Sequence, residues 1–149
     1  MIKFSKKGTH QITIKLLVYF FCVLKSFTGF ANNLTTEAKI GDSKIAITLQ
    51  PLDLKNRPLD SIPLNKLIKV KVLLNALTNK SSKLPKLEIF NANMPKHRHG
   101  MITKPVVKMS SESEYIVEGV KLHMPGEWQL NMQFGEGKNA TQVAIPLKL

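Results

Sequence analysis

Short segments that alternate between apolar and polar residues run through the chain from residue 44 onward. Alternation with a period of two places the apolar side chains on one face of a β-strand, and no segment beyond residue 31 has the 3.6-residue period of an amphipathic helix. Pro, Gly, Asn and Ser residues separate the segments, which is typical of turns between antiparallel strands. The predicted strands are 44–50, 67–74, 87–92, 106–109, 115–122, 128–134 and 142–147.

These strands favour an all-β fold, an immunoglobulin-like antiparallel β-sandwich of about seven strands. Gly119 lies inside a predicted strand and indicates a bulge there. Pro146 indicates that the last strand lies at a sheet edge, because proline has no N–H to donate to a neighbouring strand.

Other positions are assigned from their place in the pattern. Residues 32–42 are polar and are expected to fray. Met109, Met132 and Trp128 fall on strand pattern and are expected to fill the core.

The first 31 residues have the organisation of a secretory signal peptide. A lysine-rich start without acidic residues precedes the apolar run 16–24, and Gly29 and Ala31 are small residues at the two positions that a signal peptidase reads. The predicted domains are therefore a signal peptide, 1–31, and one β-sandwich domain, 32–149. A retained anchor is the alternative, but the apolar run is about half of the roughly 20 residues that span a membrane.

Cleavage after Ala31 changes what chemistry is available to the chain. Cys22 leaves with the signal, so disulfides, cysteine nucleophiles and thiolate metal sites are excluded. The remaining protein is expected in the periplasm or otherwise outside the cytoplasm, with no stable membrane span. Its 17 basic and 10 acidic residues give a charge of +7, against +12 for the whole chain. Four aromatic residues are too few for a nucleic-acid stacking platform, so no nucleic-acid partner is expected.

Every histidine beyond the signal lies in one of two short segments, MPKHRHGM at 94–101 and LHMPGEW at 122–128. The same segments contain Met94, Met101 and Met124. Thioether sulfur selects Cu(I), and imidazole suits both copper and zinc, so a set that mixes the two without cysteine favours copper. Calcium and magnesium are disfavoured because they prefer oxygen ligands.

The spacing in the first segment restricts how a metal could be held. In an extended chain His97, His99 and Met101 project from one face, but successive side chains on that face lie roughly 6.5 to 7 Å apart. Gly100 would therefore have to let the chain curl into a loop. Lys96 and Arg98 add positive charge that lowers cation affinity unless both side chains point to solvent.

In the second segment, Pro125 and Gly126 indicate a tight turn. Because neighbouring residues in a strand point to opposite faces, only one of His123 and Met124 should reach the first segment, and His123 is preferred.

An MPxHxHGM segment followed about twenty residues later by HMPGxW resembles the YtkA-like and FixH-like families of exported bacterial domains. The resemblance covers the chain from about Ile40 onward. It implies an immunoglobulin-like sandwich in the periplasm or cell envelope, connected to copper handling and cytochrome oxidase maturation, with an envelope partner such as an oxidase subunit. The metal ligands that it implies are Met94, His97, His99, Met101, His123 and Met124.

Two functions remain open at this stage. The first is a copper carrier that holds Cu(I) and hands it to a partner. The second is a metal-free module that uses the same two segments to dock another envelope protein, with histidines as pH-sensitive contacts. An enzyme is not expected, because no serine lies in a nucleophile-elbow pattern and no paired carboxylates accompany the histidines.

Overall fold

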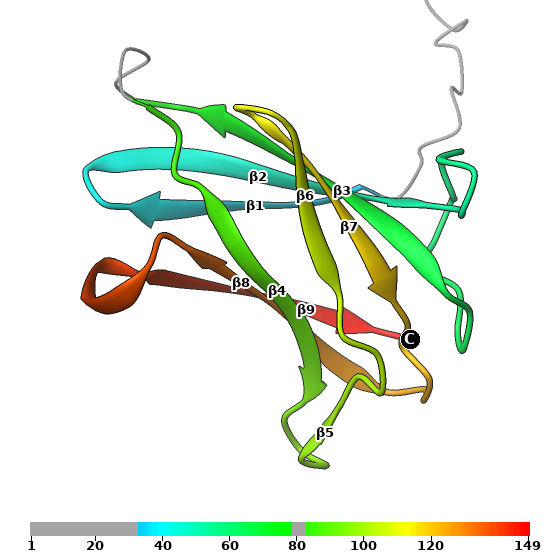
Figure 1. The fold of residues 1–149 in the computed structure, drawn as a ribbon. Helices are drawn as coiled ribbons and strands as arrows, with labels where there is room; N and C mark the ends of the chain where they lie inside the picture. The colour runs from blue at the N-terminus through cyan, green and yellow to red at the C-terminus, as the bar shows by residue number, and fades with distance from the viewer. Residues whose placement is uncertain (1–32, 79–82) are drawn as a thin grey trace, which may run out of the picture.

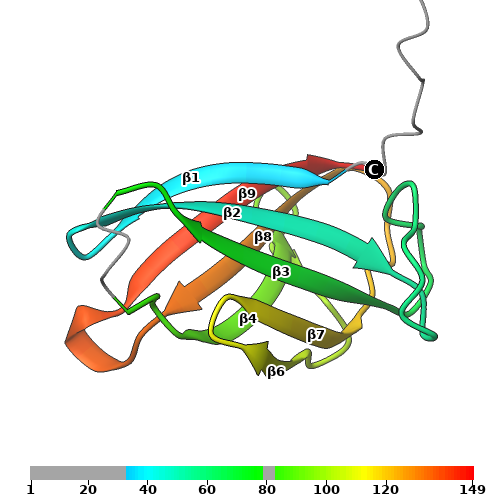
Figure 2. The same ribbon diagram turned by 90° about the horizontal axis from the view of Figure 1, so that it is seen from above.

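The structure is a computed structural model that describes residues 33–78 and 83–149, so the predicted signal peptide with Cys22 lies outside the described residues. Two antiparallel sheets pack face to face, which confirms the predicted all-β sandwich (Figures 1 and 2). Their strand orders are β1-β2-β3-β7-β6 and β5-β4-β8-β9. The strands are β1 (Leu34–Ile40), β2 (Ser43–Leu52), β3 (Ile68–Ala76), β4 (Leu87–Met94), β5 (His99–Gly100), β6 (Val106–Ser111), β7 (Glu114–Val120), β8 (Glu127–Phe134) and β9 (Thr141–Lys148).

The core forms between the two sheets from every second residue of their strands. In β3 the inward residues run from Ile68 to Leu74, and in β8 they run from Trp128 to Phe134. Each such side chain contributes about 1.5–3 kcal/mol by leaving water. No charged or polar residue is buried within the described ranges. Trp128 and Met132 therefore occupy the core positions that the alternation predicted.

Two predictions about strands were wrong. Residues 32–42 were expected to fray, but Leu34–Ile40 forms β1, which pairs with β2 from Ser43 to Leu49; Leu34 and Ala38 pack on the core and Ile40 is buried. Polar residues alternate with these three because β1 is an edge strand with one face in water. Together with the two-residue β5, this strand raises the number from about seven to nine in the described chain.

The prediction that Met109 fills the core was also wrong. Met109 pairs with the buried Tyr115, but its side chain is 61% exposed. Met109 lies in β6, an edge strand of its sheet that is exposed along most of its length.

The predictions for Gly119 and Pro146 are confirmed. Ile68 pairs with Val120 and Lys69 with Glu118, which leaves Gly119 as the extra residue of a bulge, with φ at 83°. Pro146 lies in β9, an edge strand.

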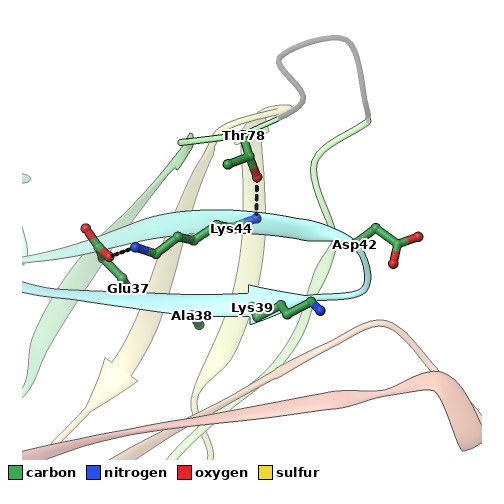
Figure 3. Close-up of a pocket in the computed structure, with 6 residues that line it drawn as sticks. All are labelled: Glu37, Ala38, Lys39, Asp42, Lys44 and Thr78. Atoms are coloured by element: carbon green, nitrogen blue, oxygen red, sulfur yellow. Dashed lines mark hydrogen bonds and ion pairs between the residues drawn. The ribbon is translucent and has the colours of Figure 1, made fainter.

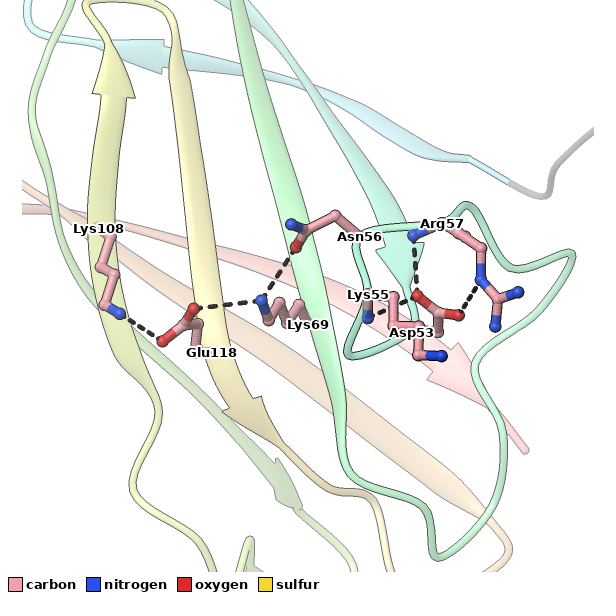
Figure 4. Close-up of polar contacts among 7 residues, drawn as sticks. All are labelled: Asp53, Lys55, Asn56, Arg57, Lys69, Lys108 and Glu118. Carbon is pink, nitrogen blue, oxygen red and sulfur yellow. Dashed lines mark hydrogen bonds and ion pairs between the residues drawn. The ribbon is translucent and has the colours of Figure 1, made fainter.

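The long connection from β2 to β3 is held by side-chain contacts (Figure 4). The Asp53 carboxylate accepts hydrogen bonds from the backbone N–H groups of Lys55 and Arg57, both at 2.8 Å, and from Nε of Arg57 at 2.6 Å. Lys69 on β3 donates to Asn56 at 3.0 Å and also pairs with Glu118. The connection is therefore stabilised by hydrogen bonds within itself and by the bond from Lys69 on β3.

Several of these contacts make the fold sensitive to acid. The backbone N–H of Arg57 lowers the pKa of Asp53, and the hydrogen bond from Lys108 lowers the pKa of Glu118. A carboxyl whose pKa is lowered on folding stabilises the fold above its unfolded pKa and loses that contribution as the pH falls through its folded pKa. We therefore expect the free energy of unfolding to decrease as the pH falls below the ordinary values of 4.5 for Glu118 and 3.8 for Asp53.

Urea unfolding followed by circular dichroism from neutral to acid pH measures this decrease. Glu118→Gln should make the loss of stability at acid pH smaller, since one titrating carboxyl is gone. The exposed and unpaired Glu112 provides the control, because Glu112→Gln should leave the pH dependence as it is. An equal change in both variants would contradict the role of the Lys108 contact.

Candidate metal site

The first of the two histidine segments forms a hairpin at one end of the sandwich. β4 and β5 pair Met94 with His99 and Asn93 with Gly100, and the turn between them is stabilised by a 3.1 Å hydrogen bond from His97 N–H to the Met94 carbonyl. The segment was expected to curl at Gly100. Instead it turns before β5, with Arg98 at a φ of 54°, so His97 lies in the turn and His99 in the strand.

The second segment connects β7 to β8 at the same end. The indole Nε1 of Trp128 donates a 2.8 Å hydrogen bond to the Met124 carbonyl. Gly126 exchanges two 3.0 Å backbone hydrogen bonds with Leu149, the last residue of the chain. Its φ of 126° agrees with the glycine turn predicted here, because side chains with a Cβ rarely adopt this conformation.

A methionine joins the two segments. Met94 is buried, and its terminal methyl carbon lies 2.9 Å from the place where a Cβ on Gly126 would stand. Any residue other than glycine at position 126 would therefore force the Met94 side chain to move. Residues distant in sequence thus come into direct contact at the end of the sandwich.

The neighbouring histidine has an unusual environment. Nδ1 of His123 is buried and has no hydrogen-bond partner among the described residues. The imidazole packs edge-on against Trp128, with ring centroids 5.7 Å apart and planes at 73°. Buried polar atoms almost always find a partner, and one that does not costs about 1–3 kcal/mol. In the tautomer protonated at Nε2, the unpartnered Nδ1 carries a lone pair that could bind a metal.

Strand register decides which ligands of the hairpin face the core. His99 is the direct cross-strand partner of Met94 and so projects from the same face of the sheet. Met101 packs partly on the core, and its N–H donates to the Ala92 carbonyl at 3.1 Å. Met124 packs on the core from the second segment. Met94, Met101 and Met124 thus pack on the core near this end of the sandwich, while His97 in the turn and His99 in β5 are both exposed.

The two positively charged residues of the hairpin, Lys96 and Arg98, are both exposed. Nζ of Lys96 forms a 2.7 Å ion pair with Glu127, and both side chains are exposed. The hydrogen bond from Lys96, followed by its charge, lowers the pKa of Glu127. Arg98 is exposed in the turn. The Glu127 carboxylate thus offsets the repulsion that Lys96 would exert on a bound cation. The sequence analysis did not predict this ion pair.

A second unpartnered atom lies in the loop that follows the hairpin. Oγ1 of Thr103 is buried without a hydrogen-bond partner in the described part of the chain. The sequence contained no signal for this residue, because a threonine in a loop is ordinarily solvated.

Two hollows mark the surface. One, of about 630 Å³, lies on the outer side of the His/Met end and is lined by residues including Pro95, Lys96, Glu127 and Pro146. The other, of about 330 Å³, lies at the opposite end, where Lys44 pairs with Glu37 at 2.5 Å and its N–H donates to Thr78 at 2.9 Å (Figure 3). Neither hollow is lined by histidine.

The donor atoms limit the kind of metal. Within residues 33–78 and 83–149, no three His, Cys, Asp or Glu residues are grouped so that they could hold a metal ion. The other side-chain donor at the His/Met end is methionine sulfur, a soft ligand that suits Cu(I). The described residues also contain no helix long and apolar enough to cross a membrane.

Comparisons with known proteins show a loose likeness to two solved structures. No family model matches the chain, and no curated protein matches it. A copper-bound variant of FetP from uropathogenic Escherichia coli has a TM-score of 0.49 and 12% identity, covering 78% of this chain and 95% of that chain. FetP from the same bacterium, as isolated after expression in the periplasm, has a TM-score of 0.48 and 11% identity, covering 78% and 94%. The resemblance to the YtkA-like and FixH-like families therefore rests on the two histidine segments alone.

Proposed function

We propose that this chain is an extracytoplasmic copper carrier that binds Cu(I) at the His/Met end of the sandwich and passes it to an envelope partner such as an oxidase subunit. The observation that carries the proposal is the buried, unpartnered Nδ1 of His123, next to the segment that Met94 contacts. Met94, His99, Met101, His123 and Met124 are the proposed ligands. His97 is expected to contribute less to copper binding, because it lies in the exposed turn.

The donor chemistry suits a carrier more than an enzyme. Thioethers and imidazoles are neutral, so they hold Cu(I) without the strong charge attraction of thiolates. His99 is exposed while Met94 is buried, which gives a partner protein access to one ligand at a time. A ligand set of this kind favours transfer of the metal, and no catalytic step is proposed.

Metal retention tests the proposal. The chain beginning at Asn32 is loaded with Cu(I), exposed to a competing chelator, and separated from it by gel filtration before copper is counted. We expect about one copper per chain, and weaker retention of Zn(II) because methionine sulfur is a poor zinc ligand. Retention of Cu(I) no better than that of a metal-free β-sandwich would refute the carrier function.

Two pairs of variants locate the site. His99→Ala should weaken Cu(I) affinity by about tenfold or more, whereas His97→Ala should weaken it less, because only His99 shares a face with Met94. Met101→Ala should also weaken binding, while Met109→Ala should not, since Met109 is an exposed methionine on β6 outside both segments. Chelator competition measures all four affinities. Equal losses for the two histidine variants would contradict the proposed geometry.

The alternative is the metal-free docking module. It is favoured by one observation, the exposure of His97, Arg98 and His99 at the tip of the hairpin. A docking surface of this kind predicts that the metal-free chain binds its partner as tightly as the copper-loaded chain. The retention experiment separates the two functions before any partner is known.

A further inference from the structure

Two loops at the His/Met end expose large aliphatic side chains. Leu64 and Leu67, in the connection from β2 to β3, are each 45% exposed, and Ile102, in the connection from β5 to β6, is 68% exposed. Exposed aliphatic residues that gather on one surface usually mark an interaction site. The proposed copper ligands do not include any of these three residues.

The two loops flank one stretch of chain, residues 119–122. On one side, the N–H of Asn65 donates a 2.7 Å hydrogen bond to the Leu122 carbonyl. On the other side, the Lys104 carbonyl lies 3.5 Å from the place where a Cβ on Gly119 would stand. In Figure 1 the β2–β3 connection lies at the right and the β5–β6 connection at the bottom, both away from the β1–β2 turn at the left. The two connections are therefore neighbours of the same short segment of chain.

Unpaired lysines accompany the aliphatic residues. Lys66 precedes Leu67, Lys104 follows Ile102 by two residues, and Lys121 lies in the stretch between the loops. None of the three forms an ion pair within the described ranges, whereas three lysines on the adjacent sheet face are each paired with a glutamate: Lys69, Lys71 and Lys108. Lys66, Lys104 and Lys121 thus have no acidic partner among the described residues.

We propose that the His/Met end docks on an anionic phospholipid surface, with Leu64, Leu67 and Ile102 entering the headgroup region and the three lysines near the phosphates. Aliphatic tips flanked by lysines suit a lipid surface. Protein interfaces are instead enriched in aromatic residues and arginine and depleted in lysine.

This docking goes beyond copper binding and does not depend on it. It would hold the proposed copper site at the membrane face, where a membrane-bound acceptor could collect the metal. Vesicle binding and copper binding are measured separately, so a failure of either proposal does not affect the test of the other.

Vesicle binding by the metal-free chain beginning at Asn32 tests the proposal. We expect co-sedimentation with vesicles of phosphatidylglycerol and phosphatidylethanolamine, little with phosphatidylcholine, and a decrease with added salt. Equal binding to both kinds of vesicle, or no binding to either, would overturn the proposal.

Lysine variants at the two ends of the sandwich show which end binds the vesicle. Lys66→Ala with Lys104→Ala should weaken vesicle binding about 25-fold, since each lysine near an anionic surface contributes about fivefold. The matched control is Lys39→Ala with Lys138→Ala, which removes the same charge at the far end and should weaken binding far less. An equal loss for both pairs would show attraction by net charge alone and would overturn the docking orientation.

A labelled side chain measures insertion directly. The chain beginning at Asn32 has no cysteine, so Ile102→Cys provides a single attachment site for a polarity-sensitive fluorophore. Its emission should shift to the blue on anionic vesicles, while a label at Leu77→Cys should not shift, because Leu77 is 44% exposed but lies at the far end. No shift at position 102 would overturn insertion. Binding to soluble polyglutamate as tight as to vesicles, or dimerisation that Ile102→Ser abolishes, would assign the surface to an acidic protein or a second copy instead.

Discussion

Trp128→Ala should lower the free energy of unfolding by about 3–5 kcal/mol, the range measured when a large aromatic side chain is removed from a packed core. Trp128 is 2% exposed, donates to the Met124 carbonyl at 2.8 Å, and packs edge-on against His123. The substitution leaves a cavity between the sheets, an unpaired carbonyl and a histidine ring without its neighbour. Both histidine segments should loosen together, so Cu(I) affinity should fall as well.

Chemical denaturation followed by far-ultraviolet circular dichroism measures this loss, because Trp128 is the single tryptophan of the chain and its fluorescence disappears with it. Trp128→Phe is the control. It keeps most of the buried area and loses the hydrogen bond to Met124, which contributes about 1 kcal/mol. If the two variants lost the same stability, the hydrogen bond rather than core packing would hold the second segment in place.

His123→Leu should change affinity and stability in opposite directions. Cu(I) affinity should fall at least about 100-fold, because the loss of an outer-shell partner alone costs about 10- to 100-fold and His123 is a proposed ligand. The metal-free protein should be as stable as the original or more stable by about 1 kcal/mol, since a buried nitrogen without a partner is replaced by an apolar group. A residue retained for packing alone would show the reverse pattern.

Thr103→Val is the matched control for this experiment. It removes the other buried polar atom that lacks a partner, Oγ1 of Thr103, with almost no change in volume. We expect it to stabilise the metal-free protein and to leave Cu(I) affinity unchanged, because a hydroxyl is not a Cu(I) ligand. Chelator competition and thermal unfolding on the three proteins give both quantities. Unchanged Cu(I) affinity in His123→Leu would remove His123 from the site.

The sequence by itself determined most of the strands. Alternation with a period of two is a local property, since it depends only on which side chains enter the core, and it placed seven strands within the observed sheets. Gly119 and Pro146 also gave correct predictions. Glycine can adopt the positive φ of a bulge, and proline has no N–H to donate to a neighbouring strand, which favours an edge. Local chemistry also singled out the two histidine segments.

Only the tertiary structure decided that β1 forms an edge strand, that Met109 is exposed, and how the proposed ligands are arranged. Leu34–Ile40 becomes a strand because β2 offers it a free edge, and Met109 is exposed because β6 ends its sheet. In the same way, the pairing of Met94 with His99 and the contact of Met94 with Gly126 depend on register and on packing between distant segments. Local periodicity does not specify such contacts, because they arise only when two sheets close on a shared core.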